Sequence, residues 1–332
     1  MTTPVQPERQ GSRFAWPEWT GRQWLEALVL AGLAPALLLA AVVLAGFDNR
    51  WVDLVAQFGA PALIGAVVLT VGLGLLRMRA AGLLSTLFAV LLAFTVWPQW
   101  FPTGPAADPE APVVRLYSAN LFHLNNDTAA IRRSIEAANP DIVVLIELGE
   151  APRQDLDRLL EGYPHRSISM PPDREQDRPR SLIASRWPLT ARAATPPGLQ
   201  AVAVTAQTPL GPVDVVGVHL TRPWPFQNSW GQISQTMALD ELVRGLNGPV
   251  IAAGDFNSVS AARIGKQIRR DIGLRPAPGF PGTWPAGLPS VLGLTIDHVY
   301  ASPDLAFVSR RLGDATGSDH RPVVTEITRA AD

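Results

Sequence analysis

A set of polar side chains stands at the ends of short apolar segments between residues 113 and 332. Its members are Asn120, Glu147, His219, Asp255, Asn257, Asp297, Asp319 and His320. They supply oxygen ligands that suit a hard divalent cation, two imidazoles that titrate near neutral pH, and carboxylates that can orient those rings. Polar groups at strand ends converge on one edge of a layered sheet fold. The set is therefore suited to acid–base chemistry beside a metal ion.

Each of these residues alone also has an ordinary structural interpretation. Asn120 suits a turn, and Asp255 with Asn257 suits an Asx-turn. Glu147 suits an ion pair with an arginine, and His219 suits a hydrogen bond to a backbone group. The remaining two aspartates suit solvated loops. Only the set as a whole favours a functional site.

Three further histidines are interpreted as structural or peripheral: His123, His165 and His298. His298 directly follows Asp297, so on a strand its ring would face the opposite side of the sheet.

The elements that must position the polar set follow from the hydrophobic pattern beyond residue 112. Short apolar runs predict strands over residues 113–119, 141–148, 181–185, 201–206, 213–219, 250–254, 295–301 and 323–328. Helical spacing predicts helices over residues 128–138, 229–246 and 260–272. The continuous run DIVVLIEL (141–148) is typical of a strand buried on both faces. Many strands with a few helices between them predict an α/β fold, a four-layer α/β sandwich of two packed mixed β-sheets flanked by helices.

The composition divides the 332-residue chain into two unlike parts. The whole is 47% hydrophobic and 17% charged, yet residues 23–97 contain only six charged side chains. The absence of cysteine excludes disulfides, thiolate catalysis and cysteine-ligated zinc or iron–sulfur centres. The net charge of −1 gives no globally basic surface for a polyanionic partner.

Three long uncharged stretches predict transmembrane helices, because each reaches the length of roughly 20 residues that a bilayer requires. They are Ala27–Phe47, Leu54–Leu76 and Ala80–Trp97. The tryptophans of the first 100 residues flank these spans, as expected at the headgroup level: Trp16, Trp19, Trp24, Trp51, Trp97 and Trp100. Residues 98–112 hold five prolines and suit an extended linker. We therefore expect an N-terminal segment (1–22), a three-helix anchor in the lipid bilayer (23–97), the linker (98–112) and a globular domain (113–332).

The arginines near the spans predict the orientation of the anchor. Arg9, Arg13 and Arg22 precede the first span, and Arg77 and Arg79 lie between the second and third. The positive-inside rule places the N-terminus in the cytoplasm. The globular domain is then expected on the periplasmic or extracellular side of an inner or plasma membrane.

The motifs that contain the polar set resemble those of the endonuclease/exonuclease/phosphatase superfamily, whose members include deoxyribonuclease I-like nucleases, inositol polyphosphate phosphatases and neutral sphingomyelinases. In order they are YSAN (117–120), IEL (146–148), GVHL (217–220), GDFN (254–257), IDHVY (296–300) and GSDHRPV (317–323). The resemblance extends from Val113 to Thr328, and the apolar N-terminal part is similar to that of bacterial membrane-anchored members. It implies a hydrolase that breaks phosphoester bonds by direct attack of water, as a phosphodiesterase, endonuclease, exonuclease or phosphatase.

The resemblance also implies a role for each residue of the set. Asn120, Glu147 and Asp319 would bind a divalent cation, Mg²⁺ or Mn²⁺. Asp255 would orient or deprotonate the attacking water, and Asn257 would hold a phosphate oxygen. The two histidines, His219 and His320, would bracket the phosphoryl group, and Asp297 would fix the tautomer of His320.

The sequence is compatible with several classes of substrate. Residues 98–332 hold 22 basic and 24 acidic side chains, which gives no basic footprint for duplex DNA. The segment RIGKQIRR (263–270) is locally basic, although a solvated helix face is the simpler interpretation. The segment TRPWPFQNSWGQ (221–232) suits stacking on a base, contact with lipid or a packed lid. A nucleic acid, a phospholipid and a small phosphodiester are all compatible, as is a non-catalytic membrane binding protein of the same fold. No protein partner is indicated.

Overall fold

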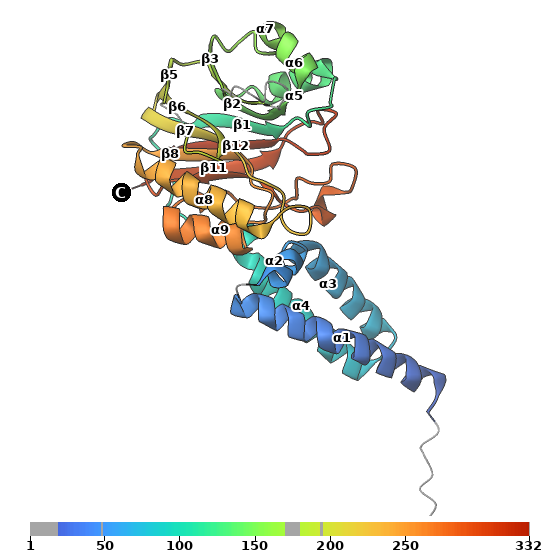
Figure 1. The fold of residues 1–332 in the computed structure, drawn as a ribbon. Helices are drawn as coiled ribbons and strands as arrows, with labels where there is room; N and C mark the ends of the chain where they lie inside the picture. Colours follow the sequence, from blue (N-terminus) through green and yellow to red (C-terminus); the bar gives the residue numbers. More distant parts are fainter. Residues whose placement is uncertain (1–18, 48, 170–179, 193–194, 332) are drawn as a thin grey trace, which may run out of the picture.

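The computed structural model describes residues 19–47, 49–169, 180–192 and 195–331. It consists of an N-terminal helical bundle and a C-terminal globular domain (Figure 1). The helical bundle contains α1 (Gly21–Ala45), α2 (Arg50–Ala56), α3 (Gly59–Leu75) and α4 (Arg79–Trp100). The first 18 residues, with Trp16 and the two arginines Arg9 and Arg13 of the predicted cytoplasmic segment, lie outside the described part.

The apolar helices follow the predicted spans with one difference. Helices α1 and α4 are each long and apolar enough to cross a membrane, whereas α2 and α3 qualify only as a pair bent by 60°. The predicted second span (54–76) is therefore interrupted between Ala56 and Gly59. The polar side chain of Gln57 lies at this break and binds the globular domain. Helix α4 also continues through Pro98, so the first three residues of the predicted linker are helical.

Two six-stranded mixed sheets form the centre of the globular domain. The first sheet has the order β11-β12-β1-β2-β4-β3, and the second has the order β5-β6-β7-β8-β10-β9. The strands of the first sheet are β1 (Val114–Asn120), β2 (Ile142–Leu148), β3 (His165–Ile168), β4 (Arg180–Ser185), β11 (Leu305–Leu312) and β12 (Val323–Arg329). Those of the second sheet are β5 (Leu189–Ala191), β6 (Gln200–Thr208), β7 (Gly211–His219), β8 (Val250–Asp255), β9 (Arg275–Pro276) and β10 (Asp297–Ala301). Each sheet has one parallel pair, β1 with β2 and β7 with β8.

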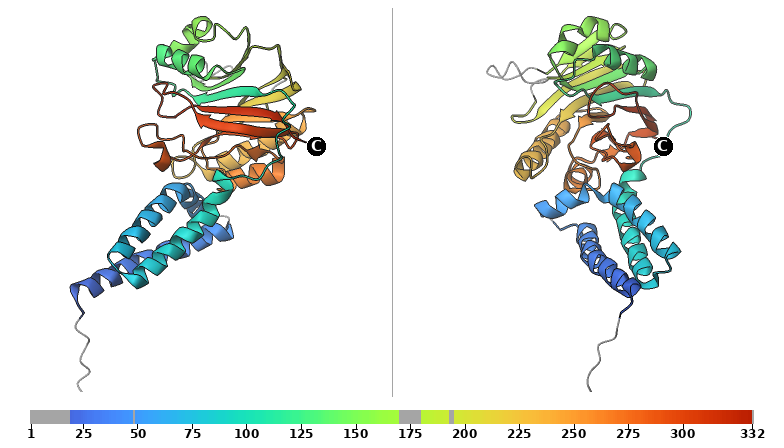
Figure 2. Two further views of the ribbon diagram at one scale, coloured as in Figure 1. Left: turned by 180° about the vertical axis from the view of Figure 1, so that it is seen from behind. Right: turned by 90° about the vertical axis from the view of Figure 1, so that its right-hand side faces the viewer.

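Helices cover the outer face of each sheet, which gives the expected four layers (Figures 1 and 2). The first sheet is covered by α5 (Thr128–Ala138), α6 (Glu150–Gln154) and α7 (Leu156–Leu159), and the second by α8 (Ser229–Arg244), α9 (Arg263–Gln267) and the π-helical turn η1 (Ile268–Ile272). Alternate residues of each strand face the two sides. Leu116 and Val144 of the first sheet meet Val215 and Ile251 of the second in the central core. The four-layer α/β sandwich predicted from the sequence is confirmed.

The four strands that the sequence pattern did not predict are the four edge strands: β3, β5, β9 and β11. An edge strand pairs on one side only and often carries polar or charged residues, which removes the continuous apolar run of a central strand. Strand β11, LAFVSRRL, illustrates this, since its second half contains the polar or basic residues Ser309, Arg310 and Arg311, and Val308, Ser309 and Arg311 are exposed.

The segment after α4 is held against the globular domain. The amide of Asp108 donates to the carbonyl of Arg329 at 3.0 Å, and the amide of Ala331 donates to the carbonyl of Ala106 at 2.9 Å. The proline-rich connection therefore runs beside the end of β12 and ties the two ends of the globular domain together.

Candidate active site

Three polar residues lie side by side on the second sheet because their strands pair in register. His219 ends β7 and is the direct partner of Asp255 at the end of the parallel strand β8. Asp297 begins β10 and is the antiparallel partner of the same Asp255. The central core residues Ile251 and Ala253 alternate with Asp255, so this carboxylate faces the space between the two sheets. Regular strand geometry thus aligns one imidazole and two carboxylates.

The first sheet contributes Asn120 by regular alternation along β1 and Glu147 through a break in its regular pairing. The register between β2 and β4 shifts between Leu145 and Leu148, and Glu147 has a positive φ of 53°. Without the shift, Glu147 would follow Ile146 onto the opposite, helix-covered face. A positive φ is unfavourable for a residue with a side chain, and such strain clusters at functional sites. The irregularity turns the Glu147 carboxylate towards the second sheet.

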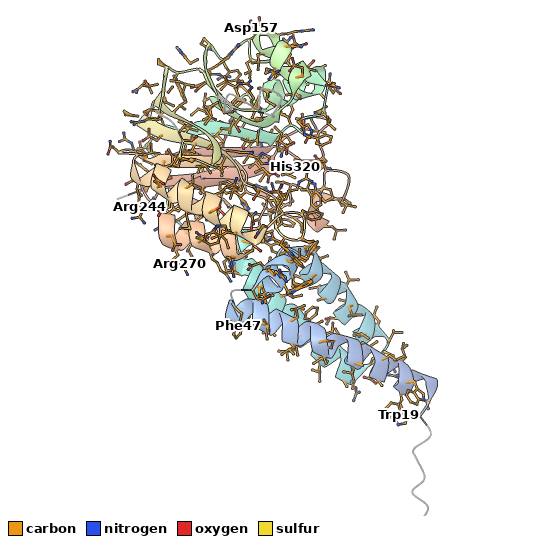
Figure 3. The ribbon with its side chains drawn as sticks, in the orientation of Figure 1. Trp19, Phe47, Asp157, Arg244, Arg270 and His320 are labelled. Atoms are coloured by element: carbon orange, nitrogen blue, oxygen red, sulfur yellow. The ribbon has the colours of Figure 1, made fainter. Side chains whose placement is uncertain are left out.

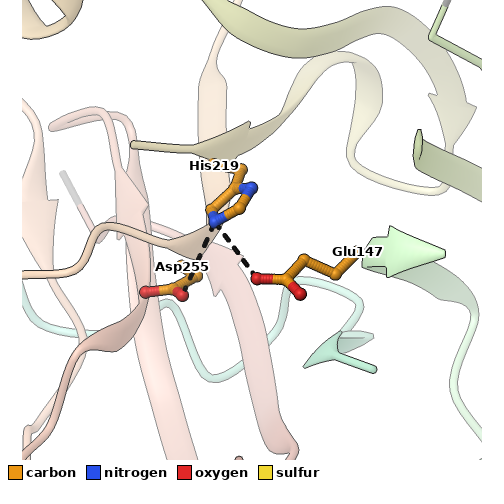
Figure 4. A group of neighbouring side chains, drawn as sticks. All are labelled: Glu147, His219 and Asp255. Carbon is orange, nitrogen blue, oxygen red and sulfur yellow. Dashed lines mark ion pairs between the residues drawn. The ribbon is translucent and has the colours of Figure 1, made fainter. Parts of the chain in front are cut away.

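The two halves meet across the gap between the sheets, and Figure 4 shows the group formed by Glu147, His219 and Asp255. The Nε2 atom of His219 lies 3.5 Å from Glu147 Oε1 and 3.9 Å from Asp255 Oδ2. The Nδ2 group of Asn120 donates to Glu147 Oε1 at 3.1 Å and to Asp255 Oδ2 at 3.0 Å. Its Oδ1 accepts from the backbone of Phe122, so Asn120 turns its amide nitrogen towards both carboxylates.

His320 joins the site from the loop before β12. Its Nδ1 is bonded to Asp297 Oδ2 at 2.9 Å, and its Nε2 lies 3.9 Å from Asp255 Oδ2. Ser318 holds this loop in place, because its hydroxyl donates to the carbonyl of Asn120 and accepts from the amide of His320. Since an aspartate oxygen accepts, the hydrogen bond fixes the proton of His320 on Nδ1 and directs Nε2 towards Asp255.

Asn257 lies beside Asp255 in an Asx-type turn. The backbone amide of Asn257 donates to Asp255 Oδ1 at 2.8 Å. Its side-chain Nδ2 group donates to Asp255 Oδ2 and to the carbonyl of Leu220. Its φ of 48° is again positive. Asp255 and Asn257 therefore form an Asx-turn and also lie within the site, so the two interpretations of the sequence are compatible with each other.

Asp319 lies at the margin of the site. Its carboxylate is exposed and accepts from the indole nitrogen of Trp284 at 3.2 Å. It belongs to neither of the two groups of close acidic and histidine side chains found among the described residues. The structure thus brings together seven of the eight polar residues and places the eighth beside His320.

Burial and charged neighbours shift the pKa values of three site residues in different directions. Burial and the neighbouring Asp297 carboxylate raise the pKa of Asp255 to about 6, against the opposite effect of the two histidines. For His320, burial alone would lower the pKa, but Asp297 and Asp255 outweigh it and raise the pKa to about 10. For Glu147, burial alone would raise the pKa, but His219 and hydrogen bonds from Asn120 and His123 hold it below its ordinary value.

The donor set fits a hard divalent cation. Glu147, His219 and Asp255 offer ligand atoms within 4.8 Å of one another, and so do Asp255, Asp297 and His320. The Oδ1 atom of Asp297 is buried and has no hydrogen-bond partner among the described residues. Three carboxylates concentrated in a buried space leave negative charge that a cation would compensate. Mg²⁺ and Mn²⁺ prefer carboxylate oxygens of this kind.

His123, which the sequence pattern indicated as structural or peripheral, instead contacts the site residue Glu147. Its ring Nδ1 lies 3.2 Å from Glu147 Oε2, and its backbone amide lies 3.3 Å from the same oxygen. No motif marks this contact, because it depends on the irregular conformation of Glu147. His298 instead lies on the opposite face of β10, where its Nε2 bonds to the carbonyl of Ser258 at 3.0 Å. His165 begins the edge strand β3, away from the site residues.

The helical bundle contributes one buried side chain to the margin of the site. Gln57, directly after α2, is only 6% exposed. Its Oε1 accepts from the amide of Val259 at 2.8 Å, and its Nε2 donates to the hydroxyl of Ser258 at 3.3 Å. Both residues follow Asn257 in the chain. An ion pair of 3.0 Å between Asp53 and Arg263 lies on the same interface.

Comparison with known proteins agrees with this geometry. A family model described as "Endonuclease/Exonuclease/phosphatase family" matches residues 117–320. A UPF0294 protein of Vibrio parahaemolyticus is 34% identical over 97 residues, which are 29% of this chain and 33% of that protein. The match thus spans about a third of the length of this curated relative.

Solved structures share the fold of the globular domain. An endonuclease/exonuclease/phosphatase from Beutenbergia cavernae is 21% identical with a TM-score of 0.54, over 66% of this chain and 72% of the other. An endonuclease/exonuclease/phosphatase from Bacteroides vulgatus is 15% identical with a TM-score of 0.54, over 66% of this chain and 99% of the other. At these identities the likeness shows the fold alone.

Proposed function

Because the chain belongs to the endonuclease/exonuclease/phosphatase family, we propose that it is a membrane-anchored, divalent-metal-dependent phosphoester hydrolase in which water attacks phosphorus directly. The observation that carries this proposal is the convergence of the two sheets, which places Glu147, His219 and Asp255 within 4.8 Å of one another. A phosphodiester is anionic, so a site that hydrolyses it must supply positive charge, an aligned water and help for the leaving group.

Asp255 is the residue suited to orient and deprotonate the attacking water. With a pKa of about 6, its carboxylate is ionised near neutral pH and yet basic enough to accept a proton. Asn257 holds this carboxylate through two hydrogen bonds. With substrate bound, one N–H of the Asn257 Nδ2 group would turn from the carbonyl of Leu220 to a phosphate oxygen.

His320 supplies positive charge next to the reacting phosphorus, and His219 adds a second imidazole. The bond from Asp297 keeps His320 protonated and directs its Nε2 towards Asp255. A protonated ring in this position can stabilise the phosphoryl oxygens and donate a proton to the departing alkoxide. His219 approaches the same space from the neighbouring strand. Asp297 therefore acts through His320 as a positioning residue.

Glu147 would hold the divalent cation. The family resemblance implies Asn120 and Asp319 as further ligands; to serve as such, Asn120 would turn its oxygen from the amide of Phe122 and Asp319 would leave the indole of Trp284. When bound, Mg²⁺ or Mn²⁺ neutralises charge on the phosphoryl group and aids departure of the alkoxide. The low pKa of Glu147 keeps its carboxylate ionised and ready to bind.

The helical bundle is the proposed membrane anchor. Its apolar helices and the arginines near their ends support a multi-pass protein with a cytoplasmic N-terminus and with the globular domain on the periplasmic or extracellular side. A reporter fused after Asp332 that is active only in the cytoplasm would contradict this orientation.

The activity is tested directly with the full chain purified in detergent. We expect hydrolysis of bis(p-nitrophenyl) phosphate with Mg²⁺ or Mn²⁺ and loss of turnover in excess chelator, with Glu147→Ala as the blank. Equal turnover with and without chelator would contradict the metal role. Equal turnover by the Glu147→Ala variant would contradict the location of the site.

A further inference from the structure

Two loops that border the site reach the aromatic ends of the helical bundle. The loop of residues 220–228 follows His219, and its Trp224 ring lies 4.2 Å from the Trp51 ring of α2. The loop of residues 277–294 precedes Asp297, and its Phe280 ring lies 5.0 Å from the Trp100 ring of α4. Aromatic side chains at the ends of membrane-crossing helices mark the headgroup level of a bilayer. Both loops therefore reach that level.

The site itself is close behind these loops. Gln57 binds Ser258 and Val259, the two residues after Asn257, and it stands two residues before the start of the apolar helix α3. Figure 3 labels His320 on the domain above the bundle, with Phe47 and Trp19 marking the two ends of α1. Gln57 therefore links the segment after Asn257 directly to the start of the apolar helix α3.

Exposed apolar side chains lie on these two loops and at the start of α8. We use the name apolar rim for five exposed residues: Phe226, Trp230, Leu288, Val291 and Leu292. The last two belong to the 3-10 turn η2 (Ser290–Leu292), which packs against α3. Because α3 is apolar and membrane-crossing in the proposed anchor, a rim that continues from it would contact lipid.

The loop of residues 277–294 also contacts the chemical groups of the site. The hydroxyl of Thr283 accepts from the amide of Asp297 at 3.2 Å, and Trp284 donates to Asp319 at 3.2 Å. A lipid that rests on the rim would thus present its phosphate next to His320, the neighbour of Asp319. A nucleic acid would instead bring a polyanionic surface against apolar side chains.

We propose that the substrate is the phosphoester of a membrane phospholipid, taken from the bilayer that holds the helical bundle; this rests on the proposed function. Water forms a new bond to phosphorus while one ester P–O bond breaks. The proton of the water passes to Asp255, and the departing alkoxide takes a proton from His320. The products are diacylglycerol with a phosphorylated headgroup, or phosphatidate with the free headgroup alcohol, according to which ester bond breaks.

The test compares three substrates with the full chain reconstituted in vesicles of phosphatidylcholine and phosphatidylglycerol with Mg²⁺. Loss of phospholipid is followed by mass spectrometry, and bis(p-nitrophenyl) phosphate and single-stranded DNA are assayed in parallel. We expect Val291→Asp to lower phospholipid hydrolysis about ten-fold, because a charged residue replaces an apolar contact with lipid. Hydrolysis of bis(p-nitrophenyl) phosphate should not change.

The matched control is Val308→Asp. Val308 lies on the edge strand β11 and is 47% exposed, against 45% for Val291, so the two changes are chemically equal. The control should keep the wild-type rate on phospholipid. An equal fall in both variants, an unchanged rate in Val291→Asp, or faster turnover of DNA than of phospholipid would overturn the lipid assignment. Turnover of none of the three substrates would instead overturn the proposed function, and the lipid assignment with it.

Discussion

The two β-sheets supply the candidate site by different structural means. On the second sheet, His219, Asp255 and Asp297 lie in a row because β7, β8 and β10 pair in regular register. On the first sheet, Glu147 faces the site because the register breaks after Leu145 and the residue takes a φ of 53°. One half of the site therefore follows from strand alternation, and the other half from a local irregularity.

The two sheets also differ in their proposed chemical roles. The regularly paired strands of the second sheet hold His219, Asp255 and Asp297, which are proposed to transfer protons or to position the groups that do. The pKa values of such groups depend on close spacing, which paired strands can maintain. The irregular half holds the proposed cation ligand, and contacts from Asn120 and His123 keep its carboxylate in place. Strain at such a position persists only when surrounding contacts outweigh it. The comparison predicts that changes in the regular half affect chemistry most, while changes in the irregular half affect metal use.

The largest effect is expected for Asp255→Asn in the second sheet. The change keeps the shape and removes the carboxylate, so kcat should fall by ~10²–10⁴-fold, the range for a general base. The measurement is turnover of bis(p-nitrophenyl) phosphate at saturating Mg²⁺. Turnover close to that of the wild type would remove Asp255 from the mechanism.

Glu147→Gln, in the first sheet, should have a smaller effect that excess metal offsets in part. We expect the Mg²⁺ concentration for half-maximal activity to rise by roughly 10–100-fold, as for other altered metal sites. Glu150→Gln is the control, because Glu150 lies three residues away on α6 and pairs with Arg153. An unchanged metal requirement in Glu147→Gln would contradict the assigned division of work.

Gln57→Ala tests the contact between the helical bundle and the second sheet. Its two hydrogen bonds hold the residues after Asn257, and loss of this positioning should lower kcat on the soluble substrate about ten-fold with little change in KM. The change Thr86→Ala is the control, since the hydroxyl of Thr86 bonds only within α4 among the described residues. A wild-type kcat in Gln57→Ala would show that the bundle has no part in the geometry of the site.

The smallest effect on turnover is expected at His298, which regular alternation places on the opposite face of the second sheet. Burial lowers the pKa of His298 to about 4, below the ordinary value of 6.5 for a histidine. Because the unfolded state binds the proton first, the contribution of His298 to the free energy of unfolding should fall by roughly 2 kcal/mol as the pH decreases to 5. Asp255 and His320, whose pKa values are raised, contribute with the opposite sign, so the difference between the wild type and His298→Gln isolates the part due to His298. Thermal unfolding at pH 7 and pH 5 measures this dependence.

The change His298→Gln should weaken that dependence on pH, and His165→Gln on the edge strand should not. An equal loss of stability between pH 7 and pH 5 in both variants would contradict the assignment to His298.

The regular half of the site could be predicted from the sequence, and the irregular half only in part. His219, Asp255 and Asp297 each stand at the end of an apolar strand, and a period of two is enough to place them on one face. The type of residue at Glu147 was evident, but its positive φ and its contact with His123 depend on tertiary packing. Gln57 gave no signal, because 201 residues separate it from Ser258. The edge strands were missed because they lack a continuous apolar pattern.

The central claim is that residues of both sheets act as one metal-dependent site, and a double-mutant cycle between Glu147→Gln and Asp255→Asn tests it most directly. Groups that act as a unit are strongly non-additive. The account predicts that the double variant hydrolyses bis(p-nitrophenyl) phosphate at nearly the same rate as Asp255→Asn alone. A rate lower than that of Asp255→Asn by the full factor that Glu147→Gln costs in the wild type would show independent contributions and contradict the account.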